Sequence, residues 1–180
     1  GTALGEFQDP WGVAVDQTTG DLYVAESNND RVQAFGYRGR PDAKIKKGAT
    51  GVPAGDGIYN TTGEGQTRRA AAARGASVTY YVPIQNDAAF AEAMRVRGTA
   101  SNSSFRVRYY APGASDVTAL VTNGTYPTPV LAPGATHTIK VVVTVRSTAP
   151  VGASLTASLK ATSTTHPTFK DTVKFVTRRA

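Results

Sequence analysis

The sequence predicts an all-β protein: an antiparallel β-sandwich preceded by a small β-meander. Three observations support this fold class. The 180 residues include 18 Gly and 10 Pro, which suits short strands joined by many turns. Runs of alternating apolar and polar residues recur through residues 58–180, and shorter runs of the same kind precede them within residues 1–36. A composition of 40% hydrophobic and 18% charged residues supports a packed core.

Charge divides the chain into two parts. Residues 1–36 carry six acidic side chains and one basic one, whereas the remaining residues carry 19 basic and seven acidic ones. We therefore expect an N-terminal module over 1–36 and a sandwich over 58–180, with surfaces of opposite sign. Opposite charge on one chain favours head-to-tail contact between copies.

Residues 37–57 combine a basic run with dense Gly and little apolar periodicity. This pattern predicts a linker. Its basic side chains are interpreted either as a solvated connector or as a clamp for an anionic polymer.

The N-terminal module contains three short strand-like runs. In one-letter code, residues 10–16 are PWGVAVD, residues 20–26 are GDLYVAE and residues 29–35 are NDRVQAF, with a turn at 18–20. This series resembles the NHL repeat, in which each repeat forms one blade of a β-propeller. The resemblance implies a propeller-like sheet, and Asp16 and Asp21 take a strand end and a turn in it rather than a calcium site.

No second copy of the repeat follows at a spacing of 40–50 residues. A single blade cannot bury both of its faces, so we expect this one to pack on a β surface outside itself. That surface belongs to further repeats of a longer precursor, to the second module of the same chain, or to another copy. A neighbouring copy is a better candidate for that surface than the same chain. The residues expected at this assembly face are Phe7, Trp11, Val13, Val15, Leu22, Val24 and Phe35.

Strand signals in the second module recur at intervals typical of a β-sandwich. The deepest burial is expected at Val82, Ile84, Ile139, Val141 and Val143. Strands are expected at residues 78–86, 94–97, 105–110, 116–121, 136–145, 155–163 and 168–177.

Three short motifs in the second module resemble segments of another known group of proteins. Residues 74–80 (RGASVTY), 131–134 (LAPG) and 149–152 (APVG) resemble segments of immunoglobulin-like modules repeated along bacterial and archaeal surface proteins. That resemblance implies adhesion, spacing or envelope structure and no catalysis.

Candidate catalytic chemistry is sparse. Cysteine is absent, which excludes disulfides, thiolate metal sites and a cysteine nucleophile. The only histidines, His137 and His166, lie at a strand start and in a turn, and most carboxylates of the second module lie in turn-like sequence. No run of 18 apolar residues predicts a membrane span. We therefore expect no catalytic, metal or cofactor site.

The strongest functional pattern is basic. Arg95 and Arg97 alternate with apolar residues on one expected strand, and Arg106 and Arg108 alternate on the next. If these strands pair as a hairpin, four guanidinium groups cover one face. That face is interpreted in three ways: as charge that guards a strand edge against aggregation, as a dock for the acidic module, or as a site for a glycan or other polyanion.

These patterns favour a non-catalytic extracellular structural subunit that forms a homo-oligomer through its N-terminal module, as in a surface layer, sheath or filament. The alternative is a carbohydrate- or polyanion-binding adhesion module of a larger secreted protein. Three Asn-x-Ser/Thr sequons, at Asn60, Asn102 and Asn123, point mildly to export.

Overall fold

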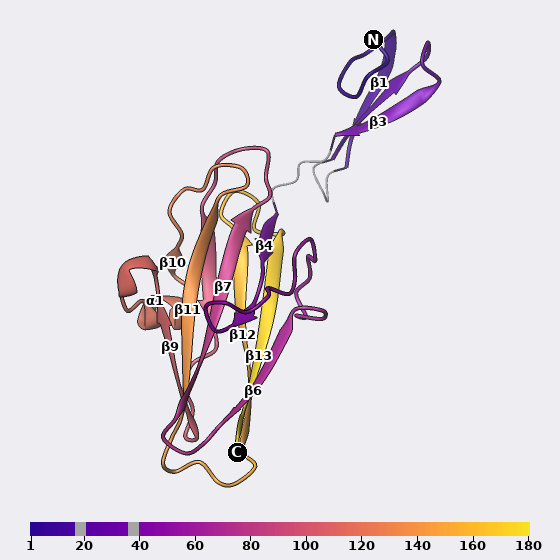
Figure 1. Ribbon diagram of the computed structural model, residues 1–180. Coiled ribbons are helices and arrows are strands. Elements are labelled where there is room, and N and C mark those ends of the chain that lie inside the picture. Colours follow the sequence, from indigo (N-terminus) through magenta and orange to yellow (C-terminus); the bar gives the residue numbers. More distant parts are fainter. Residues whose placement is uncertain (17–20, 36–39) are drawn as a thin grey trace. The chain divides into compact units, whose positions relative to one another are not determined.

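The computed structural model describes residues 1–16, 21–35 and 40–180 (Figure 1). The chain divides into two compact units, Gly1–Arg38 and Gly39–Ala180. The turn predicted at 18–20 and residues 37–39 of the predicted linker lie outside the described residues.

The N-terminal unit is a three-stranded antiparallel sheet. Its strands are β1 (Pro10–Val15), β2 (Leu22–Glu26) and β3 (Arg31–Phe35), in the order β1-β2-β3. All three are rich in β-branched and aromatic residues, which favour strands. Because only the central strand has two neighbours in the described sheet, β1 and β3 are edge strands.

The second unit is a β-sandwich, as predicted. The strands of one sheet, called here the β12 sheet, are β10 (Tyr126–Pro127), β8 (Met94–Gly98), β12 (Ser154–Ser163), β13 (Lys170–Arg179) and β6 (Thr67–Ala72), in that order. The strands of the other, the β11 sheet, are β4 (Pro41–Ala43), β7 (Ser77–Asn86), β11 (Thr136–Val145) and β9 (Phe105–Tyr110), with β5 (Lys46–Lys47) paired to β7. In Figure 1 the long strands β7 and β11 run beside each other, as do β12 and β13.

The core lies between the two sheets and is made by the inward side chains of their alternating strands. Val82, Ile84, Ile139, Val141 and Val143 are all fully buried, which confirms the predicted core positions. The largest buried side chains beside them are Tyr80, Tyr109, Phe105 and Phe175.

The prediction of a linker over 37–57 is wrong from Pro41 onward. β4 pairs with the end of β7, Ala43 opposite Ile84, and Ile45 is fully buried. The segment belongs to the sandwich, which therefore begins well before residue 58. Glycines with positive φ, such as Gly48 at 70° and Gly55 at 107°, let the chain turn sharply between these short strands, so a high Gly content marked tight turns here.

The strand predicted over 116–121 is also wrong, because the helix α1 (Thr118–Asn123) replaces it. Val117 and Val121 are buried four residues apart, which is the spacing of a helix face. Gly124 ends the helix at φ 74°, and its N–H donates to the carbonyls of Leu120 and Val121. A short 3₁₀ turn, η1 (Pro112–Ala114), precedes it.

The short strands β4, β5, β6 and β10 were not expected from the sequence. β6 also departs from the antiparallel prediction, because it joins the edge of the β12 sheet parallel to β13, with Thr67 opposite Lys174. The remaining strand pairs of the described sandwich are antiparallel.

Candidate assembly surface and basic faces

The buried carboxylate of Glu26 organises the N-terminal unit. It accepts hydrogen bonds from Arg31 Nε (2.7 Å), the Gln8 backbone N–H (2.7 Å), Gln33 Nε2 (2.6 Å) and Asn29 Nδ2 (2.7 Å). The hydrogen bond from the Arg31 guanidinium is the main reason why the pKa of Glu26 falls to about 2. Glu26 therefore fixes the β2–β3 turn to the chain that precedes β1.

Residues 1–9 fold over one end of the sheet. Arg31 donates hydrogen bonds to the carbonyls of Thr2, Ala3 and Glu6, and the rings of Phe7 and Phe35 lie 5.5 Å apart. This N-terminal strap covers part of the face that holds Gln33.

The residues predicted for the assembly face differ in exposure. Val13, Val15, Leu22, Val24 and Phe35 share one face by strand register, and Trp11 lies at a β-bulge beside them. We call these six residues the Val13 face. Gln33 lies opposite Val24 on the same side of the sheet, so the N-terminal strap covers part of this face. Val24 is buried, and Leu22 and Phe35 are half-buried, within the chain itself. In contrast, Trp11 is 79% and Val13 67% exposed, and Val15 and Phe7 are also exposed. Their burial against another surface stays a prediction.

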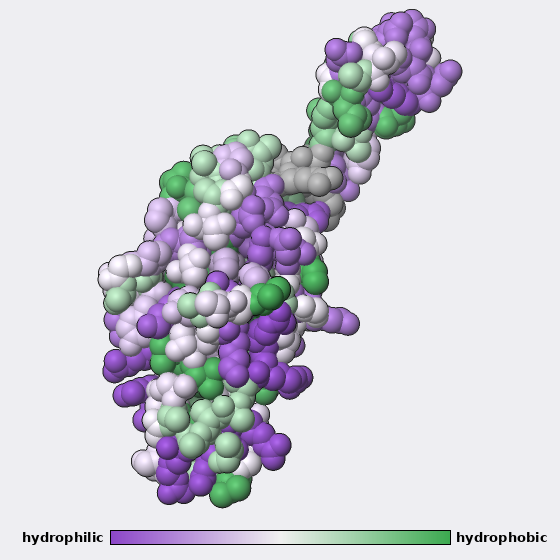
Figure 2. Space-filling model, viewed as in Figure 1, coloured by the Kyte–Doolittle hydropathy of each residue, from purple (hydrophilic) through white to green (hydrophobic). Residues whose placement is uncertain are grey.

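The opposite face of the same sheet is apolar as well, which the sequence analysis missed. Strand register aligns Gly12 with Ala25 and Val32, and Ala14 with Tyr23 and Ala34. These six residues, the Val32 face, include no charged side chain, and Val32 is 64% exposed. Figure 2 shows hydrophobic residues, in green, at the surface of the N-terminal unit. The signal was available, because strands that are apolar at consecutive positions predict burial on both faces.

The four arginines do not form the single predicted face. β8 pairs with β12 and β9 pairs with β11, so the two strands belong to opposite sheets of the sandwich and the predicted hairpin is wrong. Arg95 and Arg97 point outward from the β12 sheet, whereas Arg106 and Arg108 point outward from the β11 sheet. The polar loop at 99–104 crosses between the sheets.

On the β11 sheet, basic side chains lie over aromatic rings. Lys140 Nζ is 5.6 Å from the centre of the Tyr110 ring, and Lys46 Nζ is 5.9 Å from that of Tyr81. The register aligns all four residues in one row across β5, β7, β11 and β9. These cations are therefore already engaged with ring faces of the protein.

The β12 sheet carries a larger number of outward basic side chains. Besides Arg95 and Arg97 on β8, they are Lys160 on β12, Lys170, Lys174 and Arg178 on β13, and Arg69 on β6. None of the ion pairs found among the described residues involves any of them.

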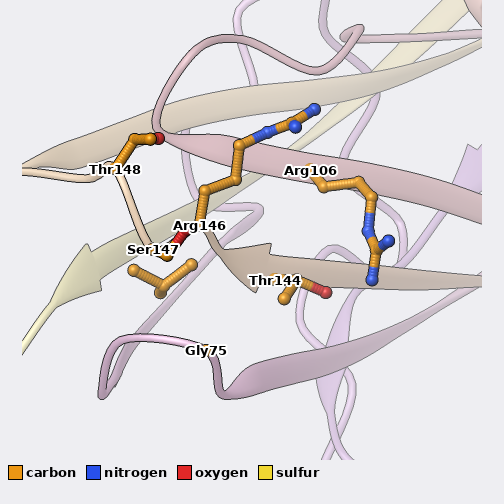
Figure 3. Close-up of a pocket in the computed structure, with 7 residues that line it drawn as sticks. Gly75, Arg106, Thr144, Arg146, Ser147 and Thr148 are labelled. Carbon is orange, nitrogen blue, oxygen red and sulfur yellow. The ribbon is translucent and has the colours of Figure 1, made fainter.

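One open cavity of about 350 Å³ lies at the end of the β11 sheet (Figure 3). It is lined by Arg106, Thr144 and residues 145–148, with Gly75 at its edge. Figure 3 shows the side chains of Arg106 and Arg146 pointing in different directions, so their guanidinium groups do not converge. No Asp, Glu or His lines this cavity, so its lining offers no carboxylate or imidazole for proton transfer.

A second cavity, of about 390 Å³, contains a stacked arginine. The Arg40 guanidinium lies 5.5 Å from the centre of the Tyr59 ring and 5.6 Å from that of Phe169, and Tyr59 donates a 2.7 Å hydrogen bond to Asp87. These contacts tie the start of the sandwich unit to the chain just before β13.

The two histidines are occupied in packing. His137 is buried, its Nε2 lies 2.9 Å from the Tyr126 hydroxyl, and burial lowers its pKa. The ring of His166 lies 6.0 Å from that of Phe169. Within the described residues, no cluster of three or more His, Cys, Asp or Glu side chains could hold a metal ion, and no helix is both long and apolar enough to cross a membrane.

Comparison with known proteins gives one family match. Residues 7–35 match the model of the NHL repeat, which agrees with the resemblance seen in the sequence and covers less than a fifth of the chain. Comparison with curated proteins gives no match.

Among solved structures, the chain is similar to the N-terminal domain of PorA, with a TM-score of 0.47, 11% identity and coverage of 76% of this chain and 96% of that one. It is also similar to a family 123 glycoside hydrolase from Clostridium perfringens (TM-score 0.42, 9% identity, 63% of this chain and 23% of that one). A third similar structure is that of the CupB6 tip adhesin from Pseudomonas aeruginosa (TM-score 0.40, 9% identity, coverage of 89% of this chain and 57% of that one).

Proposed function

We propose that this protein is a non-catalytic extracellular structural subunit that assembles by stacking its N-terminal sheet on the N-terminal sheets of neighbouring copies. The observation that carries the proposal is a three-stranded sheet with exposed apolar side chains on both faces. The extracellular assignment is supported by the sequons, since Asn102 and Asn123 are exposed.

The way in which repeat units pack on one another indicates the partner of the N-terminal sheet. A repeat unit buries its apolar faces against further copies of the same unit, and only one such unit is present in the sequence. A second copy of this chain is the neighbour that we propose. The sandwich offers no equivalent acceptor among its described residues, because exposed apolar residues such as Val52, Leu120 and Val151 are scattered over separate loops and the short helix α1.

The two faces of the sheet differ, which determines the kind of assembly. Trp11 and two valines project from the Val13 face, whereas the Val32 face is made largely of Gly and Ala. Stacking the first face of one copy on the second face of the next is a heterologous contact, which produces a closed ring or an open filament. Each fully buried large side chain contributes about 1.5–3 kcal/mol, and several are needed to offset an association cost of about 4–15 kcal/mol.

The salt dependence of assembly distinguishes stacking of N-terminal sheets from docking of the acidic N-terminal unit on a basic surface of the sandwich. The four arginines expected to form that acceptor lie on opposite sheets. Stacked N-terminal units both carry the acidic segment, so their mutual repulsion is screened as the salt concentration rises. Assembly through stacking should therefore become stronger with added NaCl.

Two valine substitutions test the proposal in the full-length chain. Val13→Lys disables one face and Val32→Lys the other, and each should reduce the assembly measured by light scattering and analytical ultracentrifugation. Val151→Lys is the matched control, because this valine is also largely exposed (82%) but lies in the sandwich. It should assemble like the unmodified chain.

Mixing the variants tests the geometry. The Val13→Lys chain keeps its Val32 face and the Val32→Lys chain keeps its Val13 face, so a mixture should form dimers that cannot grow further. An unmodified chain that stays monomeric at all salt concentrations, or a control that loses assembly to the same extent, would show that the proposed function is wrong.

A further inference from the structure

We infer that the outward face of the β12 sheet is a binding surface for an acidic polysaccharide, a chain of sugars that carry carboxylate or sulfate groups. This site is independent of the N-terminal sheet and does not rest on its assembly. The inference starts from the geometry of β8, β12 and β13, whose outward side chains form one continuous surface.

On these strands, apolar side chains that point into the core alternate with side chains that point outward. Leu159, Ala161, Val173 and Phe175 point into the core and are buried, so the residues between them point outward. Within β6, β8, β12 and β13, which the structure describes in full, no Asp or Glu takes an outward position, and Asp171 of β13 is fully buried.

The register brings the basic groups close together. Arg97 lies directly opposite Lys160, and Arg95 lies opposite Thr162, which in turn faces Lys170. Neighbouring strands are about 4.8 Å apart, and successive outward residues of a strand are about 6.7 Å apart. Several cations therefore lie within a Debye length of one another, so their positive potentials reinforce each other over this face.

A pocket of about 300 Å³ opens within this surface, which is the lower end of the usual size for a small-molecule site. Arg97 and Lys160 line it, and so do the hydroxyl-bearing residues Thr61, Thr99, Ser158 and Thr172, together with Gly98. The Thr172 hydroxyl finds no hydrogen-bond partner within the described part of the chain.

This lining selects among anionic ligands. Two cations suit a carboxylate or sulfate, and side-chain hydroxyls suit the hydroxyl groups of a sugar ring. No aromatic residue lines the pocket, so it lacks the ring faces on which the bases of single-stranded nucleic acids stack. A sugar polymer with acidic groups therefore fits better than a nucleic acid.

The β11 sheet provides a matched control. Arg106 and Arg108 are exposed at alternate positions of β9, as Arg95 and Arg97 are on β8. On that sheet, however, the neighbouring cations of Lys140 and Lys46 lie over tyrosine rings. The variants Arg95→Gln/Arg97→Gln and Arg106→Gln/Arg108→Gln change the net charge equally, so only the face differs.

Isothermal titration calorimetry with the full-length chain tests the inference. The probes are heparin as a sulfated polymer, polygalacturonate as a carboxylated one, neutral dextran, and the single-stranded nucleic acid poly(dT). We expect heparin or polygalacturonate to bind and dextran not to bind, and the preference between the two separates a sulfate site from a carboxylate site. Affinity should fall as the NaCl concentration rises from 50 to 200 mM.

Arg95→Gln/Arg97→Gln should weaken polysaccharide binding by roughly tenfold or more, as expected for the loss of charge-assisted hydrogen bonds, and Lys160→Gln should weaken it further. Arg106→Gln/Arg108→Gln should change it by less than about threefold, the effect of net charge alone. Light scattering confirms that the compared variants share one oligomeric state. Equal losses in both double variants, tighter binding of poly(dT), or no binding of either acidic polymer would overturn the inference.

Discussion

Replacing Asp42 with Asn should remove a pH dependence from the stability of the sandwich. The Asp42 side chain is almost fully buried beside β7, where one carboxylate oxygen accepts hydrogen bonds from the Gly57 backbone N–H (3.3 Å) and Lys44 Nζ (3.2 Å). The other oxygen finds no hydrogen-bond partner among the described residues. Burial outweighs these favourable contacts and raises the pKa of Asp42 to about 6 from its ordinary value of 3.8.

The magnitude follows from that pKa. A folded-state pKa above the unfolded-state value means that the native protein binds the proton more tightly. Ionised Asp42 therefore lowers the free energy of unfolding by about 3 kcal/mol above pH 6, and this cost disappears as the pH falls to about 4. Asn is uncharged and retains an acceptor for Gly57 and Lys44, so Asp42→Asn should be more stable than the unmodified chain at pH 7.

Urea unfolding between pH 4 and 7.5, followed by far-UV circular dichroism, measures this effect. At pH 7 the free energy of unfolding of the unmodified chain should be smaller than that of Asp42→Asn. This difference should shrink as the pH falls through 6. Asp56→Asn is the control, because Asp56 is an exposed partner of the same Lys44 and its lowered pKa acts only in more acidic solution. If Asp42→Asn retains the pH dependence of the unmodified chain, the assignment to this buried carboxylate is wrong.

Two further substitutions test the core and the N-terminal unit. Val141→Ala, at a fully buried position of β11, should lower the free energy of unfolding by about 1–4 kcal/mol in the same urea experiment, whereas Val142→Ala on the outward side of the strand should cost less. Glu26 has its pKa lowered to about 2, so its stabilising contribution is present above about pH 4.5 and lost as the pH falls toward 2. Glu26→Gln should destabilise the N-terminal unit at pH 7 and remove this acid sensitivity, as measured by the fluorescence of Trp11, the single tryptophan. An unchanged acid transition in that variant would contradict the role given to Glu26.

The alternation of apolar and polar residues along the sequence predicted where the long strands lie and which of their side chains are buried. The alternation of valines on β11 indicated both a strand and its buried side, because side-chain direction has a period of two along any strand. The same rule assigned the outward direction of Arg95 and Arg106. It could not show that β8 and β9 pair with different strands, since pairing depends on residues such as Lys160, which lies opposite Arg97 but is far from it in the sequence.

Buried carboxylates were missed for a related reason. Asp42 lies within the predicted linker, and Asp171 lies near the start of the strand predicted over 168–177, where the local pattern does not indicate a buried carboxylate. Asp171 nevertheless accepts hydrogen bonds from Gln66 Nε2 (2.7 Å) and from the backbone N–H groups of Ala43 (2.7 Å) and Asn60 (3.1 Å), and burial raises its pKa. These partners lie more than 100 residues away along the chain, so only the folded structure brings them together.

The position of β13 has a consequence for biosynthesis. This strand, Lys170–Arg179, lies between β12 and β6 and forms the parallel pairing with residues 67–72. β6 has no other strand neighbour in the described sheet, so it cannot take its place until β13 has been made. A ribosome that has translated only as far as β12 therefore exposes an incomplete sheet edge and an unfilled site for Phe175. The sandwich must therefore close late, after nearly all of its residues have left the exit tunnel.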